Sequence, residues 1–186
     1  MFRTISAALA ATLIAGAAFA APIKVKPANP QPTGLKQGLA VKYATGNSFG
    51  SVDEGIRTLK RAKAGEPLAG FDYRDTKDGE ETLTSGKPHK VMADISGYVK
   101  FDAAGTYTVE FMANDGLIAE IGGEEGGYLG GKGKCRKSKP VEISVPSAGW
   151  YDFEAIYFQH KGTACLHMKA GIGKTKWMEN ASFGYK

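Results

Sequence analysis

The tripeptide Asn114-Asp115-Gly116 carries side chains that are suited to binding a metal ion. Calcium takes six to eight oxygen ligands, and adjacent amide and carboxylate side chains on a loop can supply the first of them. The same tripeptide is also typical of a tight turn, because Asn and Asp tolerate unusual φ values and hydrogen-bond their own backbone. The tripeptide alone therefore leaves two interpretations open, a Ca²⁺ site at Asn114 and Asp115 or a structural turn.

A glycine-rich segment, residues 122–133, contains Tyr128 near its middle and leads into a run of cations. We expect the glycine-rich segment to form a long, flexible loop, of the kind that makes variable contacts on a rigid scaffold. The cations can attract an anionic polymer such as teichoic acid, lipopolysaccharide or an acidic exopolysaccharide, and the alternative is a solvated loop. These cations are Lys132, Lys134, Arg136, Lys137 and Lys139.

Residues that could perform catalysis are few. His160 and His167 flank a predicted turn and could lie near each other, but two histidines without a third ligand do not define a zinc site. Asp152 and Glu154 have the spacing of paired carboxylates, yet alternation explains them as the solvent side of a strand. The sequence therefore predicts a protein without enzyme activity. Trp177, in the polar segment GKTKWMEN, is the aromatic residue that we single out for stacking on a sugar ring.

Residues 1–20 have the features of a secretory signal peptide: one early cation, an apolar run, and Ala18-Phe19-Ala20 as the cleavage site. We therefore expect an exported protein, either periplasmic or secreted. Its only cysteines, Cys135 and Cys165, form an even pair, and in an oxidising compartment this favours a disulfide over a metal site or a nucleophile.

Length and charge indicate one mildly basic domain. The 186 residues carry a formal charge of +5, and removal of the signal peptide with its single Arg3 leaves 5 − 1 = +4. We expect no nucleic-acid partner, because the charges are mixed in sign and an exported protein seldom meets nucleic acid. We also expect no membrane insertion, since no later segment approaches the roughly 20 apolar residues that a bilayer requires.

The chain divides into three predicted parts: the signal peptide at 1–20, a proline-rich linker at 21–33, and a folded domain at 34–186. Early in the domain, Ser51 and Glu54 form a capping box that predicts a short amphipathic helix of about three turns. Beyond it, at least six alternating segments at short spacing predict an all-β fold, an antiparallel β-sandwich.

One heptapeptide, A-G-x-Y-x-[V/F]-E, occurs twice, at 104–110 and at 148–154. Each copy places a glycine after a polar turn and then alternates apolar with polar residues, as a half-buried strand does. The strings ISGYVKFDAAGTYTVEFMANDG and VEISVPSAGWYDFEAIYFQHKGTACLHMKAG follow the order and spacing typical of the PA14 domain. The chain resembles that family from about residue 34 to residue 185.

This resemblance implies a β-sandwich in which sugar-binding members hold Ca²⁺, and through it a glycan, with two adjacent aspartates. In this chain Asn114 replaces the first aspartate, which removes one negative charge. Gly122 occupies the position of a later aspartate, and the nearby Glu120, Glu124 and Glu125 could replace its carboxylate.

Two functions follow as hypotheses. The first is a non-catalytic module that binds a glycan or another envelope component through the loops around Asn114-Asp115 and residues 122–139, with Ca²⁺ as a candidate cofactor. Tyr128, Lys134, Arg136 and Trp177 are its other candidate contacts. The second is a structural sandwich that docks onto an envelope protein and binds neither sugar nor metal.

Overall fold

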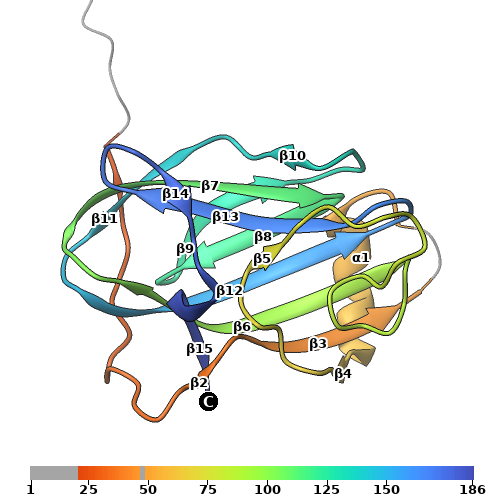
Figure 1. Ribbon diagram of the computed structural model, residues 1–186, viewed down its shortest axis with the longest axis horizontal. Helices are drawn as coiled ribbons and strands as arrows, with labels where there is room; N and C mark the ends of the chain where they lie inside the picture. Colours follow the sequence, from red (N-terminus) through yellow and green to blue (C-terminus); the bar gives the residue numbers. More distant parts are fainter. Residues whose placement is uncertain (1–20, 47–48) are drawn as a thin grey trace, which may run out of the picture.

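Two β-sheets pack face to face in the computed structural model, which describes residues 21–46 and 49–186 (Figure 1). The predicted all-β sandwich is confirmed. All strand pairs are antiparallel except the parallel pair formed by β1 and β11. The predicted signal peptide, residues 1–20, lies outside the described residues.

The seven-stranded sheet has the order β1-β11-β7-β13-β14, with β10 beside β7 and β5 beside β13. Because successive side chains of a strand point to opposite faces, each long strand turns its apolar residues inward. The strands are β1 (Ile23–Lys24), β5 (Asp72–Tyr73), β7 (Gly105–Asn114), β10 (Arg136–Lys137), β11 (Val141–Val145), β13 (Cys165–Gly171) and β14 (Lys176–Trp177).

The eight-stranded sheet has the order β2-β15-β6-β12-β8-β9, with β3 beside β6 and β4 beside β3. Its two longest strands, β6 and β12, pair along their whole length and form its centre. The strands are β2 (Lys36–Gln37), β3 (Ala40–Thr45), β4 (Lys63–Ala64), β6 (Val91–Phe101), β8 (Gly116–Ile121), β9 (Glu124–Leu129), β12 (Gly149–Gln159) and β15 (Phe183–Tyr185).

Aromatic rings from both sheets fill the space between them. Phe71 lies at the centre, with its ring centroid 5.0 Å from that of Phe153 and 5.9 Å from those of Phe111 and Phe183. All four side chains are buried. Rings at these separations stabilise a core beyond the area that they bury.

The two copies of the heptapeptide lie in opposite sheets, one at the start of β7 and the other at the start of β12. Gly105 and Gly149 both have positive φ, 153° and 145°, which favours glycine at the turn. The Tyr107 hydroxyl donates to the Ala103 carbonyl at 3.1 Å, and the Tyr151 hydroxyl donates to the Ser147 carbonyl at 2.7 Å. In each copy the tyrosine therefore closes the turn that precedes its own strand.

Ser51 caps the predicted helix through its hydroxyl, which accepts a hydrogen bond from the Glu54 amide at 3.2 Å. The predicted short helix is present, but only its first turn is α-helical: α1 spans Val52–Gly55 and continues as the 3₁₀ helix η1, Ile56–Arg61. A second 3₁₀ helix, η2, spans Asn180–Ser182. Gly55 packs against the Met92 side chain so closely that a Cβ would meet its sulfur at 2.3 Å, which ties α1 to the sheet.

The predicted linker and the predicted glycine-rich loop both contribute strands to the sandwich. The predicted linker, residues 21–33, contributes strand β1 and the buried Val25 and Ala28, so it packs as part of the domain. The glycine-rich segment 122–133 is not a long loop, because its first half is the hairpin of β8 and β9 with a tight turn at Gly122-Gly123. In both segments, pairing with a neighbouring strand, β11 for β1 and β8 for β9, outweighed the local composition.

Candidate functional site

The chain passes from one sheet to the other at Asn114-Asp115. β7 of the seven-stranded sheet ends at Asn114, and β8 of the eight-stranded sheet begins at Gly116. Gly116 is required here, because a Cβ would meet the Phe158 ring at 2.4 Å and the Leu129 carbonyl oxygen at 2.7 Å. β7 and β12 both end on this side of the sandwich, on the right in Figure 1. We call this crossing the corner, together with the two segments that cover it, the β9–β10 loop (residues 130–135) and the β12–β13 turn (residues 160–164).

Asn114 uses its amide nitrogen to hold the turn between β12 and β13. The nitrogen donates to the Thr163 carbonyl and, at 3.0 Å, to the Thr163 hydroxyl. The side chain is only 4% exposed, and its Oδ1 is buried without a hydrogen-bond partner among the described residues. An aspartate has no such donors, so the asparagine at this position has a structural role that an aspartate lacks.

Asp115 holds two loops together with its carboxylate. Its Oδ1 accepts a hydrogen bond from the Gly133 amide at 2.8 Å, and its Oδ2 accepts one from the His160 amide at 2.6 Å. The residue is 4% exposed. Charge-assisted bonds of this kind are the strongest that a backbone amide makes, so Asp115 fixes the β9–β10 loop against the end of β12.

Above these two residues lies an open pocket of about 520 Å³. Exposed lysines surround it, two from the β9–β10 loop and one from the β12–β13 turn, whereas its single carboxylate is buried beneath them. The residues that line it are Asn114, Asp115, Lys132, Gly133, Lys134, His160, Lys161, Gly162 and Thr163.

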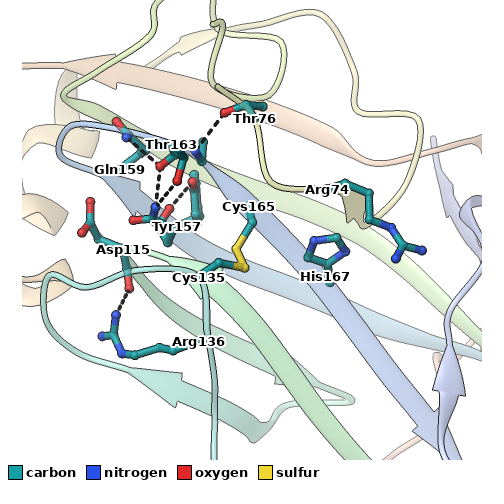
Figure 2. The surroundings of a disulfide bond; sticks show 12 residues. Arg74, Thr76, Asp115, Cys135, Arg136, Tyr157, Gln159, Thr163, Cys165 and His167 are labelled. Carbon is teal, nitrogen blue, oxygen red and sulfur yellow. Dashed lines mark hydrogen bonds between the residues drawn. A yellow bond between two sulfur atoms is a disulfide. The ribbon is translucent and has the colours of Figure 1, made fainter. Parts of the chain in front are cut away.

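The β9–β10 loop is fastened at its far end by Arg136 and by the disulfide (Figure 2). Arg136 donates from Nη1 to the Asp115 carbonyl at 2.9 Å and from Nη2 to the Gly131 carbonyl. The predicted Cys135–Cys165 disulfide is confirmed, with Cα atoms 5.9 Å apart. It joins the loop to β13, whose Cys165 pairs with Asn114. Arg136 therefore positions the loop and does not line the pocket.

Two other predicted contacts lie away from the pocket. The Tyr128 ring is 46% exposed on β9, where its hydroxyl donates to Asp53 of α1 at 3.0 Å. Trp177 lies on β14, with the Lys169 ammonium 4.2 Å and the Arg74 guanidinium 4.9 Å from its ring centroid. Neither residue lines the pocket, so the structure does not join them to Asn114 and Asp115.

The remaining cations and carboxylates of the sequence analysis are also dispersed. Lys137 forms an ion pair with Glu110 at 3.2 Å, outside the pocket. Glu120 and Glu125 face each other across the β8–β9 hairpin, and Glu124 follows its turn, so none of the three lines the pocket with Asp115. Asp152 and Glu154 lie on the exposed face of β12, as alternation predicts.

The two histidines have different surroundings. His160 lines the pocket, and burial followed by the nearby Lys132 lowers the pKa of its imidazole, with Lys161 and Lys90 adding to the effect and Asp115 opposing it. His167 is buried on β13, where its Nδ1 lies 2.9 Å from Asp72.

Zinc has no complete site at His167. Across residues 21–46 and 49–186, the one group of three His, Cys, Asp or Glu side chains within reach of a common ion is Cys135, Cys165 and His167, with ligand atoms within 4.8 Å of one another. The disulfide occupies both sulfurs. Figure 2 shows the His167 ring beside that bond.

The donor set at the corner does not fit a calcium ion. Both Asp115 carboxylate oxygens already accept backbone amides, and the Asn114 oxygen is closed off from solvent. Calcium sites gather several carboxylates and carbonyls, whereas this pocket offers one carboxylate beneath three ammonium groups. The repulsion of a divalent cation by three lysines adds to the shortage of ligands.

Sequence reasoning missed Lys161 and Thr163 as members of the site. Thr163 receives the Asn114 amide, and Lys161 adds a third ammonium to the pocket. Both lie in the turn between β12 and β13, about fifty residues from Asn114, and their proximity depends on the pairing of β13 with β7. The signal in the sequence was the position of that turn, directly after the strand that begins with the second heptapeptide.

The PA14 domain family matches residues 52–181, so this chain belongs to that family. Among solved structures, the PA14 domain of the antifreeze protein MpAFP is similar at a TM-score of 0.68 and 15% identity, covering 86% of this chain and 96% of that one. The PA14 sugar-binding domain of an RTX adhesin is similar at 0.65 and 17%, covering 81% and 99%.

A third solved structure is the A domain of epithelial adhesin 6 from Candida glabrata, in complex with Galβ1-3GlcNAc. It is similar at a TM-score of 0.64 and 13% identity, covering 84% of this chain and 90% of that one. No curated relative matches the chain. At these identities the likeness to solved structures shows the fold. No helix in residues 21–46 or 49–186 has the length and apolar character that crossing a bilayer requires.

Proposed function

We propose that this protein is an exported, non-catalytic module that binds a glycan at the corner pocket. The observation that carries the proposal is the pocket itself. It lies where strands of both sheets end, and three separate segments supply its polar lining: Asn114-Asp115, the β9–β10 loop and the β12–β13 turn.

Two kinds of likeness support this proposal. Membership of the PA14 family provides a scaffold on which other members bind sugar, since one solved relative is described as a sugar-binding domain and another holds a disaccharide. The resemblance seen in the sequence implies that Asn114-Asp115 corresponds to the adjacent aspartates through which sugar-binding members hold a glycan. The disulfide and the predicted signal peptide both favour export to an oxidising compartment, periplasmic or extracellular.

The pocket favours binding over catalysis. Its one carboxylate is held by two backbone amides, so it is not free to act as a general base or as a nucleophile. No second carboxylate lines the pocket within the described part of the chain. Of the similar solved structures, one is a sugar-binding domain and another is an adhesin domain in complex with a disaccharide.

The test is to map binding on the oxidised, mature protein by NMR. A panel of neutral and acidic oligosaccharides is titrated, with and without calcium. We expect the amide signals of Gly133, His160 and Gly162 to shift on binding, whereas those of Asp152 and Glu154 on the outer sheet face stay unchanged. If no sugar shifts the corner signals at millimolar concentration, or the shifts gather on another face, the proposal is wrong.

A second candidate function is docking onto an envelope protein. It is favoured by the exposed face of the eight-stranded sheet, where Glu154 on β12 lies directly across from Glu120 on β8 and beside a depression that also includes Asp94. Facing like charges destabilise a sheet, so a basic partner surface would relieve them. Glu154→Lys should then abolish capture of one defined partner from an envelope fraction and leave sugar binding unchanged; capture that survives this substitution argues against the outer face.

A further inference from the structure

We infer that the corner pocket recognises acidic saccharides directly, through the ammonium groups of Lys132, Lys134 and Lys161, with no calcium ion between protein and sugar. The inference rests on the proposed glycan-binding function and specifies its ligand: a sugar that bears a carboxylate, a sulfate ester or a phosphate.

A ligand that reaches the pocket meets a net positive charge. Three lysines and one carboxylate line it, a formal charge of 3 − 1 = +2. The charges are also layered, because all three lysines are exposed whereas Asp115 is 4% exposed. An approaching ligand therefore meets the ammonium groups, and the carboxylate lies beneath them.

Asp115 does little to repel an anion. Its two oxygens accept the Gly133 and His160 amides, and its main-chain carbonyl accepts Arg136. Donors that point at a carboxylate place partial positive charge next to it, which opposes the field that an approaching anion meets. The same bonds keep the two lysine-bearing loops at a set separation, so the carboxylate organises the cationic rim.

The His160 ring lies among the same charged groups, and they act on its pKa. Burial lowers the pKa of this imidazole, and so do Lys132, Lys161 and Lys90, against the opposing effect of Asp115. Three cations and one carboxylate therefore act on this residue. An anion that enters the pocket reduces the effect of the cations and raises the pKa of His160, which makes the ring a probe of occupancy.

The pocket offers no aromatic surface for a neutral sugar. Among the described residues that line it, none is Trp, Tyr or Phe, so no broad aromatic face is available to stack on a pyranose ring. Trp177 lies on β14 with two cations close to its ring. Without stacking, affinity has to come from polar contacts, and an anionic group adds Coulomb attraction to the hydrogen bond that an ammonium donates.

The experiment titrates the oxidised, mature protein in EDTA. The ligands are oligosaccharides bearing uronate, sulfate-ester or phosphodiester groups, each paired with its neutral counterpart, and sodium sulfate and sodium phosphate serve as free anions. We expect at least one acidic oligosaccharide to bind ten or more times as tightly as its neutral counterpart and as either free anion. Its binding weakens as salt rises and raises the pKa of His160.

Lysine variants locate the effect. Lys134→Gln and Lys161→Gln each remove one ammonium from an exposed side chain and should weaken acidic binding about tenfold, with unchanged thermal unfolding. Lys137→Gln is the matched control, because it lies in the same cationic run but pairs with Glu110 outside the pocket. It should leave the affinity within twofold of the wild type.

Four results overturn the inference. These are equal binding of the acidic and neutral counterparts, loss of binding in EDTA with recovery in calcium, a free anion that binds as tightly as the best oligosaccharide, and an equal loss in the Lys137 control. A neutral sugar that binds at the corner with calcium would contradict the inference and leave the glycan-binding function intact. If no sugar of either kind shifts the corner amides, both are wrong.

Discussion

Asn114→Asp restores the pair of adjacent aspartates that the family resemblance leads one to expect, and we predict that it destabilises this protein. The asparagine donates two hydrogen bonds to Thr163, and an aspartate can donate neither. Two such bonds stabilise the fold by about 1 kcal/mol each. Placing a charged carboxylate at a site that is 4% exposed costs a further 1–3 kcal/mol, roughly. The free energy of unfolding should fall by about 3–5 kcal/mol in total.

Urea denaturation of the oxidised protein, followed by tryptophan fluorescence, measures this loss. Asn29→Asp is the matched control, because it makes the same chemical change at an exposed residue and should alter the free energy of unfolding by less than about 0.5 kcal/mol. The measurement is repeated in EDTA and in millimolar calcium. If Asn114→Asp created a working ion site, calcium at one hundred times its dissociation constant would return about 2.7 kcal/mol.

We expect no such return, because Asp115 stays committed to two backbone amides and the lysines stay in place. The reasoning is refuted if the variant is as stable as the wild type in EDTA, since the amide of Asn114 would then have no structural role. It is equally refuted if calcium raises the stability of the unmodified protein, because the corner would then hold the ion as it stands.

Three further predictions concern the supports of the site. Gly116→Ala should lower the free energy of unfolding by about 2 kcal/mol or more, because a Cβ would meet the Phe158 ring at 2.4 Å; an unchanged urea midpoint would contradict this. Replacing both cysteines by serine should cost about 3–4 kcal/mol from the entropy of a 30-residue separation, and should weaken ligand binding by freeing the β9–β10 loop. Burial lowers the pKa of His167 despite its contact with Asp72, so folding favours the neutral ring, and stability should decline as pH falls below about 6.5. His167→Gln should flatten that part of the curve, as urea unfolding between pH 5 and 8 would reveal.

Much of the fold was predictable from local patterns. Alternation along 105–111 and 149–157 predicted strands because a strand in a sandwich buries every second side chain. The turn glycines Gly105 and Gly149 were predictable because positive φ is costly for other residues. The disulfide followed from a lone pair of cysteines with a predicted signal peptide, and the structure confirms it.

Segments whose structure depends on distant partners were predicted less well. Residues 21–33 resemble a linker in composition, yet β1 pairs with β11 more than a hundred residues away. The glycine-rich segment resembles a loop, yet Gly127 allows β9 to lie against Phe111, where a Cβ would come within 2.4 Å of the ring. In the first segment pairing with β11 determined the outcome, and in the second the close approach to Phe111 contributed; neither partner lies in the segment's own stretch of sequence.

For the site, the sequence by itself determined which residues have the right chemistry: an amide and a carboxylate side by side, a cationic run, and two cysteines. Only the tertiary structure decided how they are used. Pairing of β13 with β7 brings the 160–163 turn over Asn114 and Asp115, which turns the amide into a donor to Thr163 and the carboxylate into a clamp for two loops. Hydrogen bonding and burial depend on which groups meet in space, so residue types that suggest a calcium site can fold into the floor of a cationic pocket.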